Sequence, residues 1–159
     1  MKIVIRCLLF AGLAMSLISP SGYAALQKCE VAVEGANKAL EEKGLPKIRD
    51  TKTLADLLRY LNDRAVLPAH FVTRDKAIKE GWSGKEQDSI RTDWTRSKTV
   101  LGGDLYTGTL PEKGPWYSAD LDSERGLPSR RHLFFNPDSK GRYLSTNNNA
   151  SVVALPPCD

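Results

Sequence analysis

The first half of the chain carries apolar residues at helical spacing. Four leucines fall at positions i, i+3, i+4 and i+7, which share one face of a helix: Leu54, Leu57, Leu58 and Leu61. Thr53, with Asp56 three residues later, resembles a capping box. This pattern predicts an amphipathic helix that begins at Thr53 and stops near Asn62-Asp63.

Two further helices are expected on either side of this one. A looser mixture of apolar and charged residues ends at Gly44-Leu45-Pro46 and predicts an N-terminal helix over about residues 27–43. Thr73 is a suitable N-cap for a short helix that runs to Glu80, and Gly81 supplies its C-terminal stop.

The second half of the chain alternates with the period of a β-strand. After a polar, aperiodic stretch over residues 83–99, strands are expected at Val100–Tyr106, Trp116–Leu121, Arg131–Phe135, Arg142–Thr146 and Ser151–Leu155. Turn residues at Asn136–Gly141 and Asn147–Asn149 separate the later strands. Helices followed by strands predict the α+β class, with N-terminal helices packed on a four- to five-stranded antiparallel sheet.

The extreme N-terminus has a different pattern. Lys2 and Arg6 precede a mostly apolar core over residues 8–18, and small residues lead to Ala24. This arrangement is typical of a secretory signal, and the core is shorter than the ~20 residues that a membrane-spanning helix needs. We therefore expect cleavage after Ala24 and a single domain over residues 25–159, secreted or periplasmic and free of the membrane.

The charge of the chain changes once this signal is removed. Without Lys2 and Arg6 the 23 lysines and arginines fall to 21, against 19 acidic residues, so the net charge falls from +4 to +2. A surplus this small does not by itself indicate a nucleic-acid partner. Only a local cluster of cations would.

Two cysteines, Cys29 and Cys158, lie near opposite ends of the expected mature chain. In an oxidising compartment they predict one disulfide that ties the termini together; free thiols and metal binding are the alternatives. The chain contains no C-x-x-C motif and no histidine-rich tract, so no zinc ligand set is evident. We expect no metal and no other cofactor.

Several short segments occur in a familiar order and spacing. They are Leu67-Pro68, Phe71-Val72-Thr73-Arg74, Gly81-Trp82, Gly102-Gly103-Asp104-Leu105-Tyr106, Leu110-Pro111, Trp116–Leu121 and the hairpin Leu133–Thr146. This set, from about Thr53 to Leu155, resembles the barnase family of secreted microbial ribonucleases. The resemblance implies the barnase-like fold, and cleavage of single-stranded RNA, typically after guanine, by the ribose 2′-hydroxyl without a metal.

The chemistry of that family needs a general base and a general acid. The resemblance places the family's glutamate base at Ser118 and its histidine acid at Asn149. Neither a serine nor an asparagine side chain exchanges a proton near neutral pH. The resemblance therefore implies reduced or absent cleavage.

Other family positions are partly retained. Arg74 stands where the family has a phosphate-binding lysine, and Arg130 or Arg131 takes the place of an active-site arginine. The base-recognition loop is expected at Tyr106-Thr107-Gly108, but it is about three residues short and lacks the family's Asn-Arg-Glu element.

His132 is the remaining candidate for proton transfer. It is either a relocated acid, with Asp120 or Glu124 as base, or a neighbour of Asp120, whose family counterpart braces the site. If the strands pair as in the family, Ser118, His132 and Asn149 line one concave face of the sheet.

Three hypotheses follow from these residues. The first is a monomeric domain that binds single-stranded RNA, or a barstar-like inhibitor protein, through a basic groove with little or no cleavage. The second is an active, metal-independent endoribonuclease. The third is an unrelated periplasmic binding or stability module that shares only the scaffold.

Overall fold

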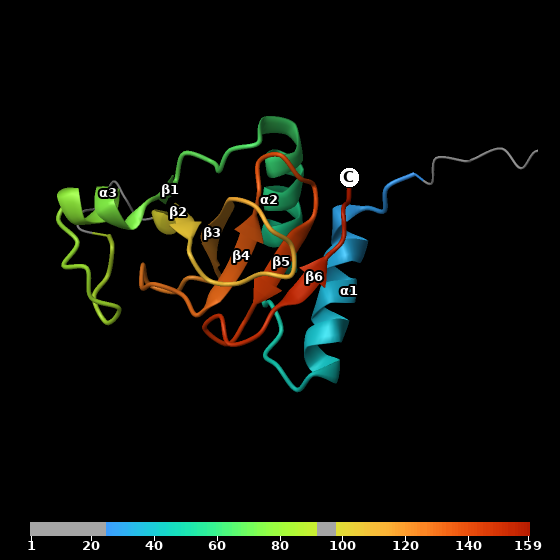
Figure 1. Cartoon of the computed structure of the whole chain (residues 1–159). Helices are drawn as coiled ribbons and strands as arrows, with labels where there is room; N and C mark the ends of the chain where they lie inside the picture. The colour runs from blue at the N-terminus through green and yellow to red at the C-terminus, as the bar shows by residue number, and fades with distance from the viewer. Residues whose placement is uncertain (1–24, 92–97) are drawn as a thin grey trace, which may run out of the picture.

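The computed structural model describes residues 25–91 and 98–159, so the predicted signal at residues 1–24 lies outside them. Within these residues, three helices and six strands follow one another (Figure 1): α1 (Cys29–Glu42), α2 (Thr51–Arg64), β1 (Phe71–Val72), α3 (Arg74–Lys79), β2 (Val100–Tyr106), β3 (Trp116–Leu121), β4 (Arg131–Phe135), β5 (Arg142–Ser145) and β6 (Val153–Leu155). The α+β class is confirmed. Among the described helices, none has the length and apolar content to span a bilayer.

The sheet differs from the expected four or five antiparallel strands. It has six strands in the order β1-β2-β3-β4-β5-β6, and β1 runs parallel to β2, with Phe71 opposite Val100. All other neighbouring strands pair antiparallel. The two residues of β1 are too few to show alternation in the sequence. Their extended conformation is stabilised by pairing with β2, which the local sequence does not reveal.

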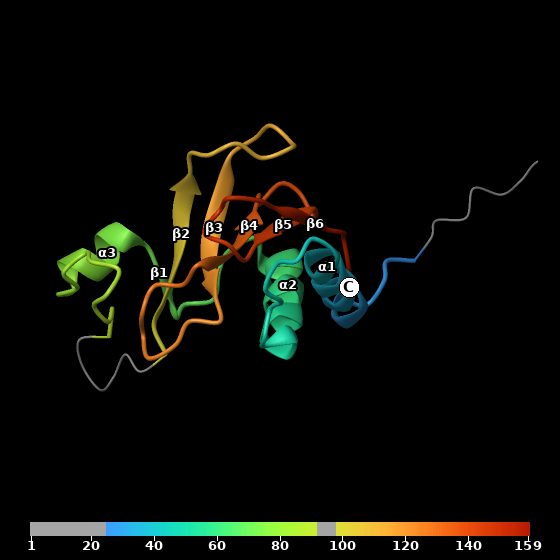
Figure 2. The ribbon, with the colours of Figure 1, turned by 90° about the horizontal axis from the view of Figure 1, so that it is seen from below.

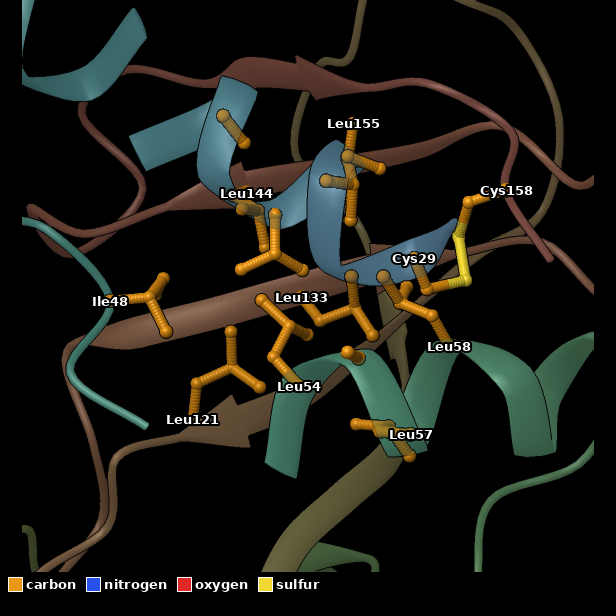
Figure 3. Packing of buried hydrophobic residues seen from close by; sticks show 14 of the residues in the cluster. Cys29, Ile48, Leu54, Leu57, Leu58, Leu121, Leu133, Leu144, Leu155 and Cys158 are labelled. Carbon is orange, nitrogen blue, oxygen red and sulfur yellow. A yellow bond between two sulfur atoms is a disulfide. The ribbon is translucent and has the colours of Figure 1, made fainter. Parts of the chain in front are cut away.

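The main core lies between the sheet and the two longer helices. Figure 2 shows α1 and α2 together under one face of the sheet, with α3 at its far end beside β1. Leucines of α2 meet leucines of β4, β5 and β6 in this layer (Figure 3): Leu54, Leu57, Leu58, Leu133, Leu144 and Leu155. Each fully buried leucine contributes roughly 1.5–3 kcal/mol. Burial of this face leaves the alternate residues of each strand on the opposite face.

The start of α2 is set by a different residue from the one expected. Asp50, rather than Thr53, is the N-cap, and its carboxylate accepts the Thr53 backbone N–H at 3.0 Å. The Asp122 carboxylate accepts the N–H groups of Arg49 and Asp50 at 2.9 and 3.0 Å. Because Asp122 comes from the turn after β3, this long-range anchor places the helix start earlier than the local pattern does.

The two other helices lie where the sequence places them. The N-terminal helix α1 falls within the predicted 27–43 range. Thr73 caps α3 as expected, because its hydroxyl accepts the Lys76 N–H at 3.3 Å. Gly81 follows the end of this helix with a φ of 107°, a conformation that favours glycine.

The predicted disulfide is confirmed: Cys29 and Cys158 are bonded across a sequence separation of 129 residues. Cys29 opens α1 and Cys158 follows β6, and both are buried. Two backbone hydrogen bonds support the link, from Cys29 N to Asp159 O and from Asp159 N to Gln27 O, each 2.9 Å long. The two ends of the domain are therefore held side by side.

Replacing both cysteines by alanine is expected to lower the free energy of unfolding by about 4–5 kcal/mol, since an open chain gains the entropy that closure of so long a loop removes. Urea unfolding of the oxidised protein and of the Cys29→Ala/Cys158→Ala variant measures the difference. A reductant should lower the midpoint of the parent and leave that of the variant unchanged. Equal midpoints without reductant would contradict a stabilising role.

Candidate functional site

A polar cavity lies on the face of the sheet opposite α1 and α2. Ser118 and Asp120 alternate along β3, and the β3–β4 register sets Asp120 directly opposite His132. These three residues line a cavity of about 120 Å³ together with Arg74, Asp104 and Asn149. The structure thus brings together the expected Ser118, His132 and Asn149, which come from three separate segments.

A second, larger cavity continues from the first. It has a volume of about 630 Å³ and shares Arg74, His132 and Asn149 with the smaller one. Its further lining includes Glu86, Ser129, Arg130 and Asn148. We refer to the two cavities together as the polar cleft.

His132 lines both parts of the polar cleft. The residue is only 8% exposed, and both ring nitrogens face oxygen atoms. Nδ1 lies 2.6 Å from Asn149 Oδ1, and Nε2 lies 2.9 Å from the Ser129 carbonyl oxygen and 3.3 Å from Asp120 Oδ1. A doubly protonated imidazole satisfies all of these acceptors, because each nitrogen then donates a hydrogen bond.

The environment of His132 favours its charged form. Burial by itself lowers the pKa of this group, but the hydrogen bond and charge of Asp120 oppose that effect. The hydrogen bonds to Asn149 and Ser129 act in the same direction as Asp120. Together they raise the pKa of His132 above its ordinary value of 6.5.

Asp120 links His132 to the next loop. It is 7% exposed, and its second oxygen accepts the Ser129 backbone N–H at 2.7 Å. The carboxylate therefore holds the imidazole on one side and the chain entering β4 on the other. Both oxygens of Asp120 are therefore engaged by neighbouring groups of the protein.

The asparagine turn after β5 closes one side of the cleft. Asn148 and Asn149 have φ values of 56° and 67°, a left-handed conformation that asparagine tolerates better than most residues. The Asn149 N–H donates to Ser145 Oγ at 3.0 Å, and the Asn148 N–H donates to the Arg130 carbonyl oxygen at 3.0 Å. These bonds hold the Asn149 amide over His132.

Arg74 lies on the α3 side of the cleft. Its backbone N–H donates to both oxygens of Asp104, at 3.2 and 3.0 Å, and its guanidinium contacts Glu86 Oε1 at 2.8 Å. The guanidinium also lies 5.5 Å from the centre of the Trp82 ring, in cation–π range. Arg74 is therefore held in place before any ligand arrives.

The charges around the cleft are balanced. Arg74, Arg130 and protonated His132 face three carboxylates, those of Glu86, Asp104 and Asp120. Arg130 is exposed, and no hydrogen bond or ion pair with a residue of the described chain engages its side chain. The groove expected to be basic thus has mixed charge, with Arg130 as its unpaired cation.

Arg131, the alternative to Arg130, points to the other face of the sheet. Its Nε lies 3.5 Å from the Asp122 carboxylate, whose side chain is 3% exposed. Strand alternation separates the two arginines, so Arg131 does not share the cleft with His132. Glu124, a candidate base, contacts Arg49 at the surface.

The expected base-recognition residues lie beside the cleft rather than in its lining. Tyr106 packs on Phe134, with ring centroids 4.4 Å apart, and Gly108 adjoins the Tyr106 ring. Thr107 is exposed. None of the three lines either part of the cleft.

The lining residues that the sequence interpretation missed include Glu86, Asp104, Ser129 and Asn148. Asp104 carried a signal, because it follows Gly102-Gly103 in a segment already associated with the resemblance. The other three lie in loops, where local periodicity is uninformative. Over the described part of the chain, no group of three or more His, Cys, Asp or Glu side chains is placed to hold a metal ion.

Comparison with known proteins does not extend this picture: no family model matches the chain, and no curated protein is significantly similar to it.

The folded protein should lose stability as the pH rises above neutrality. Folded His132 binds a proton more tightly than the unfolded chain does, so its contribution is complete below about pH 6.5 and is lost as the pH rises through the higher folded pKa. Urea unfolding between about pH 6 and 9 should show this decline, and His132→Gln should flatten it.

His70 provides a control of opposite sign. Burial, followed by the charge of Lys98, lowers its pKa, so the contribution of His70 to stability decreases as the pH falls below about 6.5. The His70→Gln variant should therefore lose less stability than the parent on acidification below about pH 6.5 and keep the parent's decline at higher pH. An unchanged profile in His132→Gln would contradict the charged state assigned to His132.

Proposed function

We propose that the polar cleft binds the phosphate groups of single-stranded RNA and that cleavage of the bound RNA is weak or absent. The observation that carries this proposal is the composition of the smaller cavity. Ser118 and Asn149, to which the barnase resemblance assigns the base and acid positions, lie there beside Arg74, to which it assigns a phosphate position. If that correspondence is right, a cation is kept where the proton-transfer groups are replaced.

Arg74 and Arg130 are the groups best suited to hold phosphate, because a guanidinium can donate two parallel hydrogen bonds to phosphate oxygens. Arg130 can bind phosphate without first breaking another contact, because no described residue bonds to its side chain. Arg74 must release Glu86, but that ion pair is exposed, with side chains 42% and 63% accessible, and pairs of this kind contribute little. Packing against Trp82 keeps the guanidinium in place when Glu86 leaves.

Weak cleavage follows from the bonding of His132. A general acid must present its proton to the leaving 5′-oxygen, and a general base must reach the 2′-hydroxyl. Both His132 nitrogens already contact protein oxygens, and Ser118 offers only a hydroxyl. Proton transfer to RNA therefore requires the loss of an internal hydrogen bond.

A second candidate function is active, metal-independent cleavage. The contact of 3.3 Å between His132 and Asp120 favours it, since a protonated imidazole beside a carboxylate is a possible acid–base pair. In that mechanism Asp120 takes the proton of the 2′-hydroxyl, the 2′-oxygen attacks phosphorus, and His132 protonates the departing 5′-oxygen. The products are a 2′,3′-cyclic phosphate and a free 5′-hydroxyl.

Affinity for a labelled, guanine-containing single-stranded oligoribonucleotide should fall as salt concentration rises. Arg130→Ala should weaken binding and reduce the slope of log affinity against log salt by roughly 0.7, the value for one lost phosphate contact on a single strand. Lys38→Ala removes one exposed positive charge from α1, on the far side of the sheet, and should leave the slope unchanged. Equal effects of the two variants would contradict a phosphate site in the cleft.

The same samples distinguish the remaining alternatives. Release of cyclic phosphate without added metal, abolished by His132→Ala, would establish the active enzyme. Absence of both binding and cleavage would remove RNA as the ligand and leave a protein partner, such as a barstar-like inhibitor, for the cleft.

A further inference from the structure

A further cavity lies on the helix side of the sheet, apart from the polar cleft. It is a cavity of about 360 Å³ between the end of α2, β1 and the central strands. Its walls are mostly apolar: Val66, Leu67, Phe71, Tyr117, Phe135 and Pro137. We call this cavity the apolar pocket.

Its shape depends on the close approach of β1 to β2. A Cβ atom on Gly102 would lie 2.6 Å from Phe71 Cδ1 and 3.0 Å from Leu67 Cδ1, so both side chains rest directly on this glycine. Gly103, the next residue, has a φ of 92° at the β-bulge of β2. The part of the pocket lined by Leu67, Phe71 and Gly102 is therefore tightly packed.

The pocket carries few polar groups. Of the described residues that line it, Lys76, exposed on α3, is the only charged one. Within the described ranges 25–91 and 98–159, no hydrogen bond or ion pair engages its ammonium group. The half-buried Tyr117 stacks near Phe135, with ring centroids 5.8 Å apart, and its hydroxyl likewise has no hydrogen-bond partner among those residues.

We propose that the apolar pocket binds a small amphipathic carboxylic acid, with its hydrocarbon body against Leu67, Phe71 and Phe135 and its carboxylate on Lys76. The volume lies within the usual range of ligand cavities, and an apolar lining with a few fixed polar groups is typical of such sites. The unpaired ammonium selects an anion, because a neutral ligand leaves that charge without a partner. The proposal does not depend on RNA binding, since the polar cleft lies on the opposite face of the sheet.

Octanoate and octanol are suitable probes, because they share a hydrocarbon chain and differ in charge. In the oxidised protein, the backbone amide chemical shifts of Val66 and Gly103 should change as octanoate is added and should reach a plateau at saturation. Lys76→Met, which keeps the apolar stem, should weaken octanoate binding two- to fivefold, the usual range for an exposed ion pair, and leave octanol binding unchanged. Lys79→Met, on the same helix but outside the lining, is the matched control.

A second variant, at Val66, tests the lining of the apolar pocket without changing Lys76. Val66 is 58% exposed, so Val66→Asp adds a negative charge at the pocket with little demand on the core. It should weaken octanoate binding more than octanol binding. Failure of octanoate to saturate these shifts, or equal weakening by Lys76→Met and Lys79→Met, would overturn the proposal. RNA affinity should be the same in all of these variants, so failure here is distinguishable from failure of the function proposed for the cleft.

Discussion

The pairing of β3 with β4 is the constraint on which both the core and the polar cleft depend. Because Asp120 is opposite His132, Ala119 is opposite Leu133, and adjacent pairs point to opposite faces of the sheet. The same register therefore buries leucine under α2 and sets a carboxylate beside an imidazole on the other face. A shift of one residue would send the polar pair into the core, at a cost that hydrophobic burial could not offset.

Asp122 connects this register to the helices. Its carboxylate holds the backbone ahead of α2 and lies within ion-pair distance of Arg131 on β4. One buried carboxylate thus joins the helix layer to the sheet, while the Cys29–Cys158 disulfide joins the two ends of the chain. On the other face, the loops that bear Ser129 and Asn149 are held by their own hydrogen bonds, from the Ser129 N–H to Asp120 and from the Asn149 N–H to Ser145.

The hydrogen bonds within the polar cleft support our proposal that its residues bind a ligand rather than transfer protons. His132 and Asp120 largely satisfy each other, and Asn149 and Ser129 occupy the remaining hydrogen-bonding positions of the imidazole. A group held by several protein partners is well suited to bracing a site, since each partner opposes the movement that proton transfer needs. Arg130, without such partners, is the group most available to an anionic ligand.

Local pattern determined the elements of this protein: leucine spacing predicts α2, Thr73 predicts the start of α3, and alternation predicts β2 to β6. The two cysteines of the expected mature chain predicted the disulfide, and Ser118, His132 and Asn149, which we expected on one face of the sheet, line one cavity. Tertiary structure decided the rest: Asp50 rather than Thr53 as the helix cap, the parallel strand β1, and Arg130 rather than Arg131 in the cleft. The periods of helices and strands can be recognised from neighbouring residues. The Asp122-anchored start of α2, the short strand β1 and the cavities depend on contacts between segments that are distant in the chain, and a single sequence does not reveal which segments those are.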